Sequence, residues 1–243
     1  MNDISNTPLA ELITAVQTII KGKLGEDVLA NDVEVAKVIT MGNMELEALQ
    51  LIADWRYLRQ DTVFVGEALA NKQVYELDSS VYKISTEEND VINIIDPETS
   101  LIISQWGIAS PSDLVPKGTS DANISKSLFR TDDNRATFIN GKLIFSRPFL
   151  NDEIGGAIEA PVYNKFTKLS VENATNPIQV RPMALFAYGI AKRLVPSDLV
   201  RANEYPVLVQ EYNDLLQNAL DENEAANIIS SVVVQTSAIR GGV

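Results

Sequence analysis

The spacing of apolar residues changes twice along this chain of 243 residues, from helical to β-like and back to helical. Thr7 can cap a helix that Pro8 starts, and Asn31 and Asp32 can cap a second one. The apolar residues of both segments recur three or four positions apart, which predicts amphipathic helices with a buried face. They are Leu9, Leu12, Ile13, Val16, Ile19 and Ile20, then Val35, Val38, Ile39, Leu46, Leu49, Ile52 and Ala53.

Short runs rich in β-branched residues follow Arg59 and predict a β region in the middle of the chain. Asn140 and Gly141 both tolerate the positive φ values of a type I′ turn, which predicts a hairpin. Pro161 cannot donate a ladder hydrogen bond and indicates an edge strand or a break. A polar stretch, 107–127, is expected to be a long loop or an interface arm. The expected strands are 62–65, 73–77, 91–95, 101–106, 137–139, 143–145 and 157–169.

Helical spacing returns after Pro177 and predicts helices over 183–194, 199–204 and from Pro206 to about Asn227. Residues 228–243 differ from these segments, because they are rich in β-branched residues and carry one charge, Arg240. We expect them not to continue the helix. They are interpreted as an arm that docks on another subunit, with a last strand of the home sheet as the alternative.

These segments predict an α+β fold. The N- and C-terminal helices are expected to form a helical bundle, with an inserted, mainly antiparallel β domain and an extended C-terminal arm. The expected bounds are 1–61 and 177–227 for the bundle, 62–176 for the β domain and 228–243 for the arm. Apolar helix residues such as Leu12, Val16, Leu49 and Ile52 are expected to be core.

The composition excludes several kinds of chemistry. Without His or Cys the chain lacks the usual ligands of zinc, copper and iron–sulfur centres and every histidine-based triad, so we expect no cofactor. The 33 acidic and 20 basic residues give a net charge of −13, which disfavours a tight grip on nucleic acid. No segment has the pattern of a signal peptide or a membrane span, so we expect a soluble protein made inside the cell.

An enzyme would have to use carboxylates, lysine, serine or tyrosine. Asp132 with Asp133, and Glu87 and Glu88 near Asp90, are the densest acidic clusters and could serve a hydrolase or a calcium site. Turn-forming residues flank both clusters and their spacing matches no calcium loop, so solvated turns are the simpler interpretation. The chain also lacks GxxxxGK[ST] and GxGxxG. We therefore expect a structural protein and not an enzyme.

Two blocks of the chain resemble the head-to-tail adaptor proteins of tailed phages, a family that includes head-completion proteins, tail accessory factors and tail tubular protein A. The first block is ELITAVQTIIKGKLGED and a helix ending ALQLIADWR, similar to the family's first helix, glycine turn and second helix ending near a tryptophan, here Trp55. The second is RPMALFAYGIAKRLVPSDLVRANEYPVLVQEYNDLLQNALDENEAAN, similar to its paired C-terminal helices. The blocks cover roughly half of the chain.

The resemblance implies a structural virion protein of the phage neck, assembled in the host cytoplasm. Such a chain forms an oligomeric, commonly dodecameric ring that docks on the portal protein and provides the platform for tail attachment and the DNA channel. Its partners would be the portal protein, a nozzle or tail-tube protein and further copies of itself, with DNA only passing through and no membrane contact. The arm implied to pack on the portal comprises Ile228, Ile229, Val232, Val233, Val234, Ile239 and Arg240.

Three alternatives stay open. Another neck or tail subunit, such as a stopper or a terminator, would share the same setting. A carboxylate-dependent hydrolase would lose its activity on replacement of Asp132 or Asp133 without loss of folding. A binding module would act as a monomer. The stretch 107–127 could contact the next tail component or a neighbouring subunit, or be a solvated loop without a special role.

Overall fold

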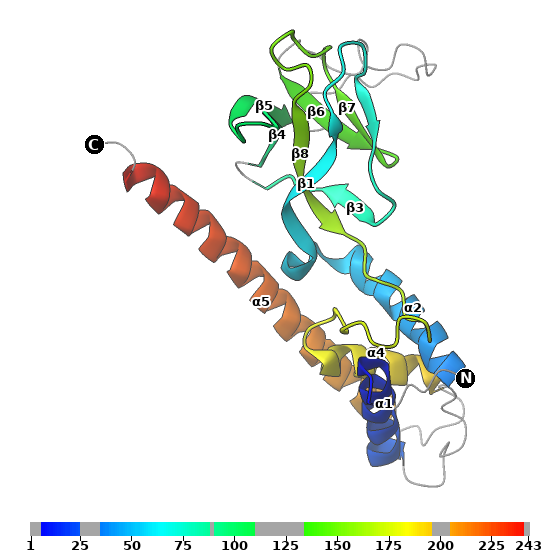
Figure 1. The fold of residues 1–243 in the computed structure, drawn as a ribbon. Coiled ribbons are helices and arrows are strands. Elements are labelled where there is room, and N and C mark those ends of the chain that lie inside the picture. Colours follow the sequence, from blue (N-terminus) through cyan, green and yellow to red (C-terminus); the bar gives the residue numbers. More distant parts are fainter. Residues whose placement is uncertain (1–5, 25–34, 88–89, 110–133, 196–204, 241–243) are drawn as a thin grey trace, which may run out of the picture. The chain divides into compact units, whose positions relative to one another are not determined.

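The computed structural model describes residues 6–24, 35–87, 90–109, 134–195 and 205–240, with the backbone alone for 21–24 and 227–240. The fold is mixed α/β (Figure 1). The chain divides into two compact units. We call Met1–Tyr57 with Phe166–Val243 the helical unit and Leu58–Lys165 the β unit. The predicted insert, 62–176, differs from the β unit at both ends.

Four α-helices make up the described part of the helical unit, and α1, α2 and α5 all pack on α4 (Figure 1). They span Pro8–Leu24 (α1), Val35–Ile52 (α2), Met183–Leu194 (α4) and Tyr205–Arg240 (α5), and a 3-10 turn, Arg56–Leu58 (η1), follows α2. The predicted cap is confirmed, since the Ala10 N–H donates to Oγ1 of Thr7 over 3.3 Å. Leu12, Val16 and Leu49 are buried as expected, but Ile52 is 45% exposed.

The chain enters the helical unit again at Phe166 and runs along α2. The side chain of Asn43 acts as a strand partner for Leu169, accepting from its N–H (2.7 Å) and donating to its carbonyl (3.1 Å). The Phe166 N–H donates to Oε1 of Gln50 over 3.0 Å. The predicted strand over 157–169 is therefore too long, because after Asn164 side chains of α2 replace a neighbouring strand.

The β unit is one curled sheet of eight strands with the order β1-β8-β4-β5-β6-β7-β2, and β3 also pairs with β8. Each neighbouring pair is antiparallel except β5 and β6. Asn140 and Gly141 have φ values of 50° and 77°, which confirms the predicted hairpin between β6 and β7. The strands are Arg59–Glu67 (β1), Val74–Glu76 (β2), Val81–Ile84 (β3), Val91–Ile95 (β4), Ile102–Ile108 (β5), Arg135–Ile139 (β6), Lys142–Phe145 (β7) and Ala157–Asn164 (β8).

Pro161 lies in the middle of the most extensively paired strand, which corrects the expectation of an edge strand. On one side of β8 the register skips, so that Asp61 and Thr62 of β1 both lie opposite Pro161. On the other side, β4 pairs as far as Glu159 and β3 begins at Val162. The proline occupies the bulge and the point where the partner strand changes, so its missing N–H removes no ladder hydrogen bond.

The two ends of the curled sheet are linked by one phenol. Tyr75 of β2 is 2% exposed, and its hydroxyl donates to the Glu67 carbonyl (3.0 Å) and accepts from the Leu69 N–H (3.1 Å) at the end of β1. Its ring packs edge-on against Phe145 and Phe149, which also enclose Trp106. The hydroxyl therefore replaces strand pairing between β1 and β2.

A buried ion pair borders this aromatic cluster. Glu153 is 1% exposed and accepts from the Arg147 guanidinium (2.9 and 3.1 Å), the Ser104 hydroxyl (2.6 Å) and the Leu150 N–H (2.7 Å). The guanidinium carbon lies 4.5 Å from the centre of the Trp106 ring. Burial raises the pKa of Glu153, but the Arg147, Ser104 and Leu150 hydrogen bonds outweigh it and hold the pKa below its usual value.

Several predictions from the pattern of the chain are corrected. Strand β3 was not predicted, and the predicted loop 107–127 begins as strand, because β5 continues to Ile108 and pairs there with β6. The remainder of that loop and the predicted helix 199–204 lie outside the described residues.

Most importantly, α5 continues to Arg240, so the backbone of 228–240 is helical and not extended. Pro and Gly are absent from 207–240, and β-branched residues disfavour a helix too weakly to end it.

Replacing Tyr75 with Phe tests the link between β1 and β2. The change leaves a part-buried carbonyl and a part-buried N–H without this partner, and we expect the β unit to lose about 1 kcal/mol of stability. The Leu69 amide should also exchange hydrogen faster, as measured by hydrogen–deuterium exchange. Tyr82→Phe is the matched control, since within the described residues the structure gives the Tyr82 hydroxyl no hydrogen bond. Equal protection of Leu69 in both variants would contradict the role of Tyr75.

The Glu153 ion pair predicts an acid-side loss of stability. Because the folded-state pKa lies below the unfolded value of about 4.5, the carboxylate stabilises the fold above that pH and the contribution fades as the pH falls through the folded pKa. Glu153→Gln should therefore be less stable than the parent at neutral pH and approach it at low pH. Chemical unfolding at a series of pH values measures this. A stability difference that is independent of pH would count against the assignment.

Candidate docking segment and its anchorage

The predicted docking residues all lie at the end of one long helix. Helix α5 has 36 residues, and Ile228, Ile229, Val232, Val233, Val234, Ile239 and Arg240 belong to its last four turns. Their side chains lie outside the described part of the structure. What the structure does describe is how the first six turns of α5 are held.

A buried carboxylate on α2 holds α5. Glu45 is completely buried, and its two oxygens accept from the Tyr212 hydroxyl of α5 (2.6 Å) and from Nε of Arg193 on α4 (2.6 Å). A Cβ at Gly189 would lie 2.6 Å from the same carboxylate, so only glycine lets α4 approach this closely. One charged group thus connects three helices that are far apart in sequence.

Two further contacts, one with a cation and one with a phenol, join α4 to α5. The Lys192 ammonium lies 3.4 Å from the centre of the Tyr212 ring, and burial lowers the pKa of this lysine while Glu45 opposes the shift. Burial raises the pKa of Tyr212, and its hydrogen bond to Glu45 raises it further. Tyr188 of α4 donates to Glu211 of α5, which raises the pKa of Tyr188 to about 12. These phenols stay protonated and act as donors.

A second contact holds α5 about three turns further on. The side chain of Asn223 accepts from the Arg56 N–H (2.7 Å) and donates to the Asp54 carbonyl (3.0 Å). Both groups follow the end of α2, where Trp55 is buried and donates from Nε1 to the Leu49 carbonyl over 2.7 Å. Asn223 is the last residue of α5 whose side-chain partners are described, and the docking residues begin five positions later.

The carboxylate clusters considered for catalysis have other roles or are not described. Arg59 donates to Glu87 (2.5 Å) and Asp90 (2.6 Å), so these carboxylates hold the start of β1. Asp132 and Asp133 lie outside the described residues. Within the part of the chain that is described, no group of three or more acidic residues could hold a metal ion. The described structure therefore adds no support to the hydrolase hypothesis.

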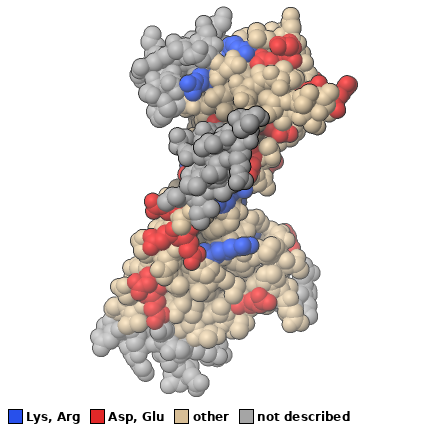
Figure 2. Space-filling view, turned by 90° about the vertical axis from the view of Figure 1, so that its left-hand side faces the viewer, with Lys and Arg blue, Asp and Glu red and all other residues tan. Residues whose placement is uncertain are grey.

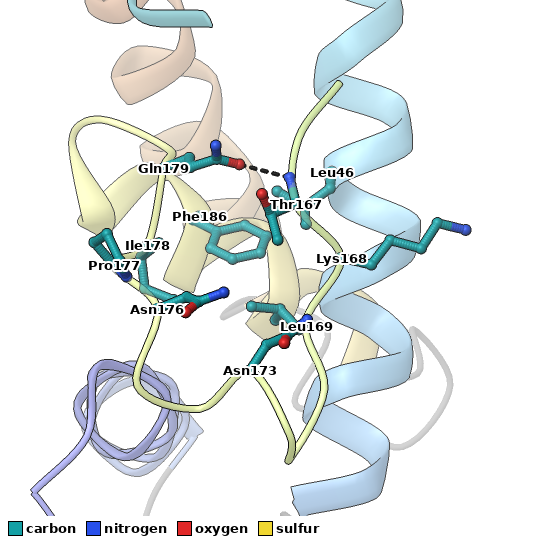
Figure 3. A pocket seen from close by; sticks show the side chains of 10 residues that line it. All are labelled: Leu46, Thr167, Lys168, Leu169, Asn173, Asn176, Pro177, Ile178, Gln179 and Phe186. Atoms are coloured by element: carbon teal, nitrogen blue, oxygen red, sulfur yellow. Dashed lines mark hydrogen bonds between the residues drawn. The ribbon is translucent and has the colours of Figure 1, made fainter. Parts of the chain in front are cut away.

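The hollow drawn in Figure 3 is too small for a ligand. It has a volume of about 20 Å³, space for a single water, and lies between α2, α4 and the segment 167–179 that precedes α4. Phe186 points into it, while Lys168 points away and pairs with Glu47 over 3.1 Å. The Oε1 atom of Gln179 accepts from the Thr167 N–H across its upper edge.

Charge on the described surface is mixed and mostly acidic. On the face drawn in Figure 2, Asp and Glu side chains occur on both units, and Lys and Arg occur singly or in small groups. A surface that follows a nucleic-acid backbone needs a continuous basic tract, which this face does not show. None of the described helices is apolar over a length that would cross a bilayer.

Comparison of the chain with models of known protein families gives no match, and comparison with curated proteins gives none either.

The Glu45 contacts were not anticipated from the sequence, although a signal was present. Glu45 falls in the series Val38, Gly42, Glu45, Leu49, whose other members form the buried face of α2. A carboxylate in such a series indicates a buried charge that needs partners. The sequence does not indicate which partners, because Arg193 and Tyr212 are 148 and 167 residues away.

Replacing Glu45 with Ala should strongly destabilise the helical unit. The change leaves Arg193 without its buried carboxylate and Tyr212 without an acceptor, and we expect a loss of about 3–5 kcal/mol. Glu47→Ala, on the same helix, removes an ion pair whose side chains are 66% and 72% exposed and should cost at most about 1 kcal/mol. Urea unfolding followed by far-ultraviolet circular dichroism compares them. Similar losses in the two variants would show that Glu45 does not connect the helices.

Proposed function

We propose that this chain is a structural virion protein, the head-to-tail adaptor subunit of a tailed phage, which docks on the portal protein through the end of α5. The observation that carries the proposal is the change in character along this one helix. Residues 205–227 include five acidic residues and no basic one, whereas 228–239 contain no charge at all. A helix anchored at one end and apolar at the other is typical of a segment that binds a partner.

The pattern of the docking segment fits binding as a helix. Ile228, Val232 and Ile239 recur four and seven residues apart, and Ile229 and Val233 recur four apart. Such spacing is typical of a helix that binds in an apolar groove. The portal surface that we propose as the partner would therefore offer a groove and not a strand edge.

The finer organisation belongs to the same proposal. In it, the N- and C-terminal helices form the bundle that builds the ring, the β unit is an insertion, and the ring provides the platform for a nozzle or tail-tube protein. The net charge of −13 supports a channel through which DNA slides without being held. The adaptor has no enzymatic activity, needs no cofactor and is located in the neck of the virion after assembly in the host cytoplasm.

Binding to portal rings from the same genome tests the proposal. The full chain should bind, and a chain truncated after Asn227 should not. Val232→Asp with Val233→Asp should weaken binding at least about a hundredfold, because each change places a charge in an apolar contact. Pull-down measures binding, and electron microscopy of the complex shows where it occurs.

Ser230→Asp with Ser237→Asp is the matched control. It adds the same two charges to the same segment, at positions outside the apolar series, and should bind almost as well as the parent chain. Binding by every variant, the truncation included, would move the contact to other helices and overturn the role of α5. No binding of the full chain to well-formed portal rings would overturn the adaptor proposal itself.

A further inference from the structure

Helix α2 carries a second apolar surface that its own unit does not cover. Its buried face contains Val38, Leu46 and Leu49. Met44, Leu51 and Ile52 are nevertheless 48%, 78% and 45% exposed. With Ala48 they recur at spacings of four, seven and eight residues, which places them along one side of the helix. We call Met44, Ala48, Leu51 and Ile52 the α2 stripe.

Helices α1 and α4 leave an open groove between them. The groove has a volume of about 700 Å³, and most of its lining residues are small or apolar. We call it the α1–α4 groove. Its residues are Asn6, Ala10, Glu11, Thr14, Ala15, Thr18 and Ile19 from the start and body of α1, and Met183, Ala184, Ala187 and Tyr188 from α4.

The hydroxyl groups of Thr14, Thr18 and Tyr188 in the groove already form hydrogen bonds within the chain. The Thr14 hydroxyl donates to the Ala10 carbonyl (2.9 Å) and the Thr18 hydroxyl donates to the Thr14 carbonyl (2.8 Å). The Tyr188 hydroxyl donates to Glu211. A small polar ligand would find few free donors, whereas small side chains on two neighbouring helices allow apolar side chains of a third helix to approach closely.

The α2 stripe and the α1–α4 groove lie on different faces of the helical unit. Helix α2 contacts α4 at Phe186, Gly189 and Ile190, as shown by the atoms that a Cβ at Gly42 or Gly189 would meet. The groove uses 183, 184, 187 and 188 of α4. At about 100° per residue the centres of these two sets lie roughly 140° apart around α4, so they belong to different faces of the helix. One copy can therefore offer the stripe to one neighbour and the groove to another.

The charges at the two surfaces are complementary. Lys37 is exposed and lies seven residues before Met44, so it extends the line of the α2 stripe by two turns. Glu11 is exposed and lines the groove. Neither side chain has an ion-pair partner in the described part of the structure. A stripe that lies in the groove with Lys37 near Glu11 would join an apolar contact to an ion pair.

We propose that the α2 stripe of one copy of this chain packs into the α1–α4 groove of a second copy. The two surfaces differ, so the contact is head-to-tail and leaves a free stripe and a free groove at the two ends of every open assembly. A head-to-tail contact forms a closed ring when the rotation that relates one copy to the next brings the last copy back to the first. The inference rests on the proposed function, because the contact would hold together the ring that the adaptor forms. The contact itself involves neither α5 nor a portal.

Cross-linking between single cysteines tests this contact directly, because the chain has no cysteine of its own. Leu51→Cys on the stripe and Ala184→Cys in the groove both replace exposed side chains, so folding should be retained. A mixture of the two variants with a short bismaleimide should give a cross-linked dimer. A chain that carries both cysteines should give a ladder of higher oligomers. Leu101→Cys, 68% exposed in the β unit, mixed with Ala184→Cys measures random collision.

Each other outcome overturns the proposal. If two copies of the Leu51→Cys variant cross-link to each other as well as to the Ala184→Cys variant, the contact is a symmetric one between two α2 stripes. Cross-linking that appears only after removal of residues 1–5 would show that the chain's own N-terminus occupies the groove. A yield equal to that of the Leu101→Cys mixture, at the highest soluble concentration, would exclude the contact. Because no portal is present, these results are independent of the portal-binding test.

Discussion

The helical unit depends on one buried carboxylate. Glu45 has no exposed surface, and a carboxylate in such a place is stable only if charged and hydrogen-bonding partners surround it. Arg193 and Tyr212 supply these partners, and Gly189 supplies the space. Apolar packing alone would allow α2, α4 and α5 to slide past one another by a turn, whereas two directed hydrogen bonds to one side chain are satisfied in a single arrangement. Glu45 therefore helps to specify how the helices from the chain's two ends pair.

The β unit solves a comparable problem with backbone groups. Strand β8 is paired on both sides, and a proline in such a strand would normally leave an acceptor without its donor. Here the register of β1 skips a residue opposite Pro161, and the Ser85 N–H donates to the Pro161 carbonyl over 2.9 Å where β4 gives way to β3. The bulge also helps the sheet to curl, which lets the Tyr75 hydroxyl reach the end of β1. The bulge opposite Pro161 and the Tyr75 link between β1 and β2 are thus parts of the same curled sheet.

The sequence predicts local structure well where a residue has one conformational role. Thr7 with Pro8 and Asn140 with Gly141 are such cases, because a cap and a positive φ are properties of the segment itself. Prediction fails where the outcome depends on distant partners. Pro161 is tolerated because of β1 and β3, and Ile52 has the helical spacing of a core residue yet is 45% exposed. The end of α5 was misjudged because β-branched residues were given more weight than the absence of Gly and Pro. The proposed docking segment rests on composition alone, whereas the Glu45 contacts and the α1–α4 groove can be identified only from the fold.

A single unbroken α5 has a consequence for how a bound partner would be oriented. The 36 residues of α5 extend over about 54 Å, and each residue added to a helix turns everything beyond it by about 100°. Tyr212 and Asn223 fix the rotation of the helix at its base, and the continuous helical backbone extends from there to Arg240. Neighbouring copies in a ring would then present their helix ends at the same rotation. The angular precision of any assembly built on these ends would derive from side chains several turns away, within the first part of the same helix.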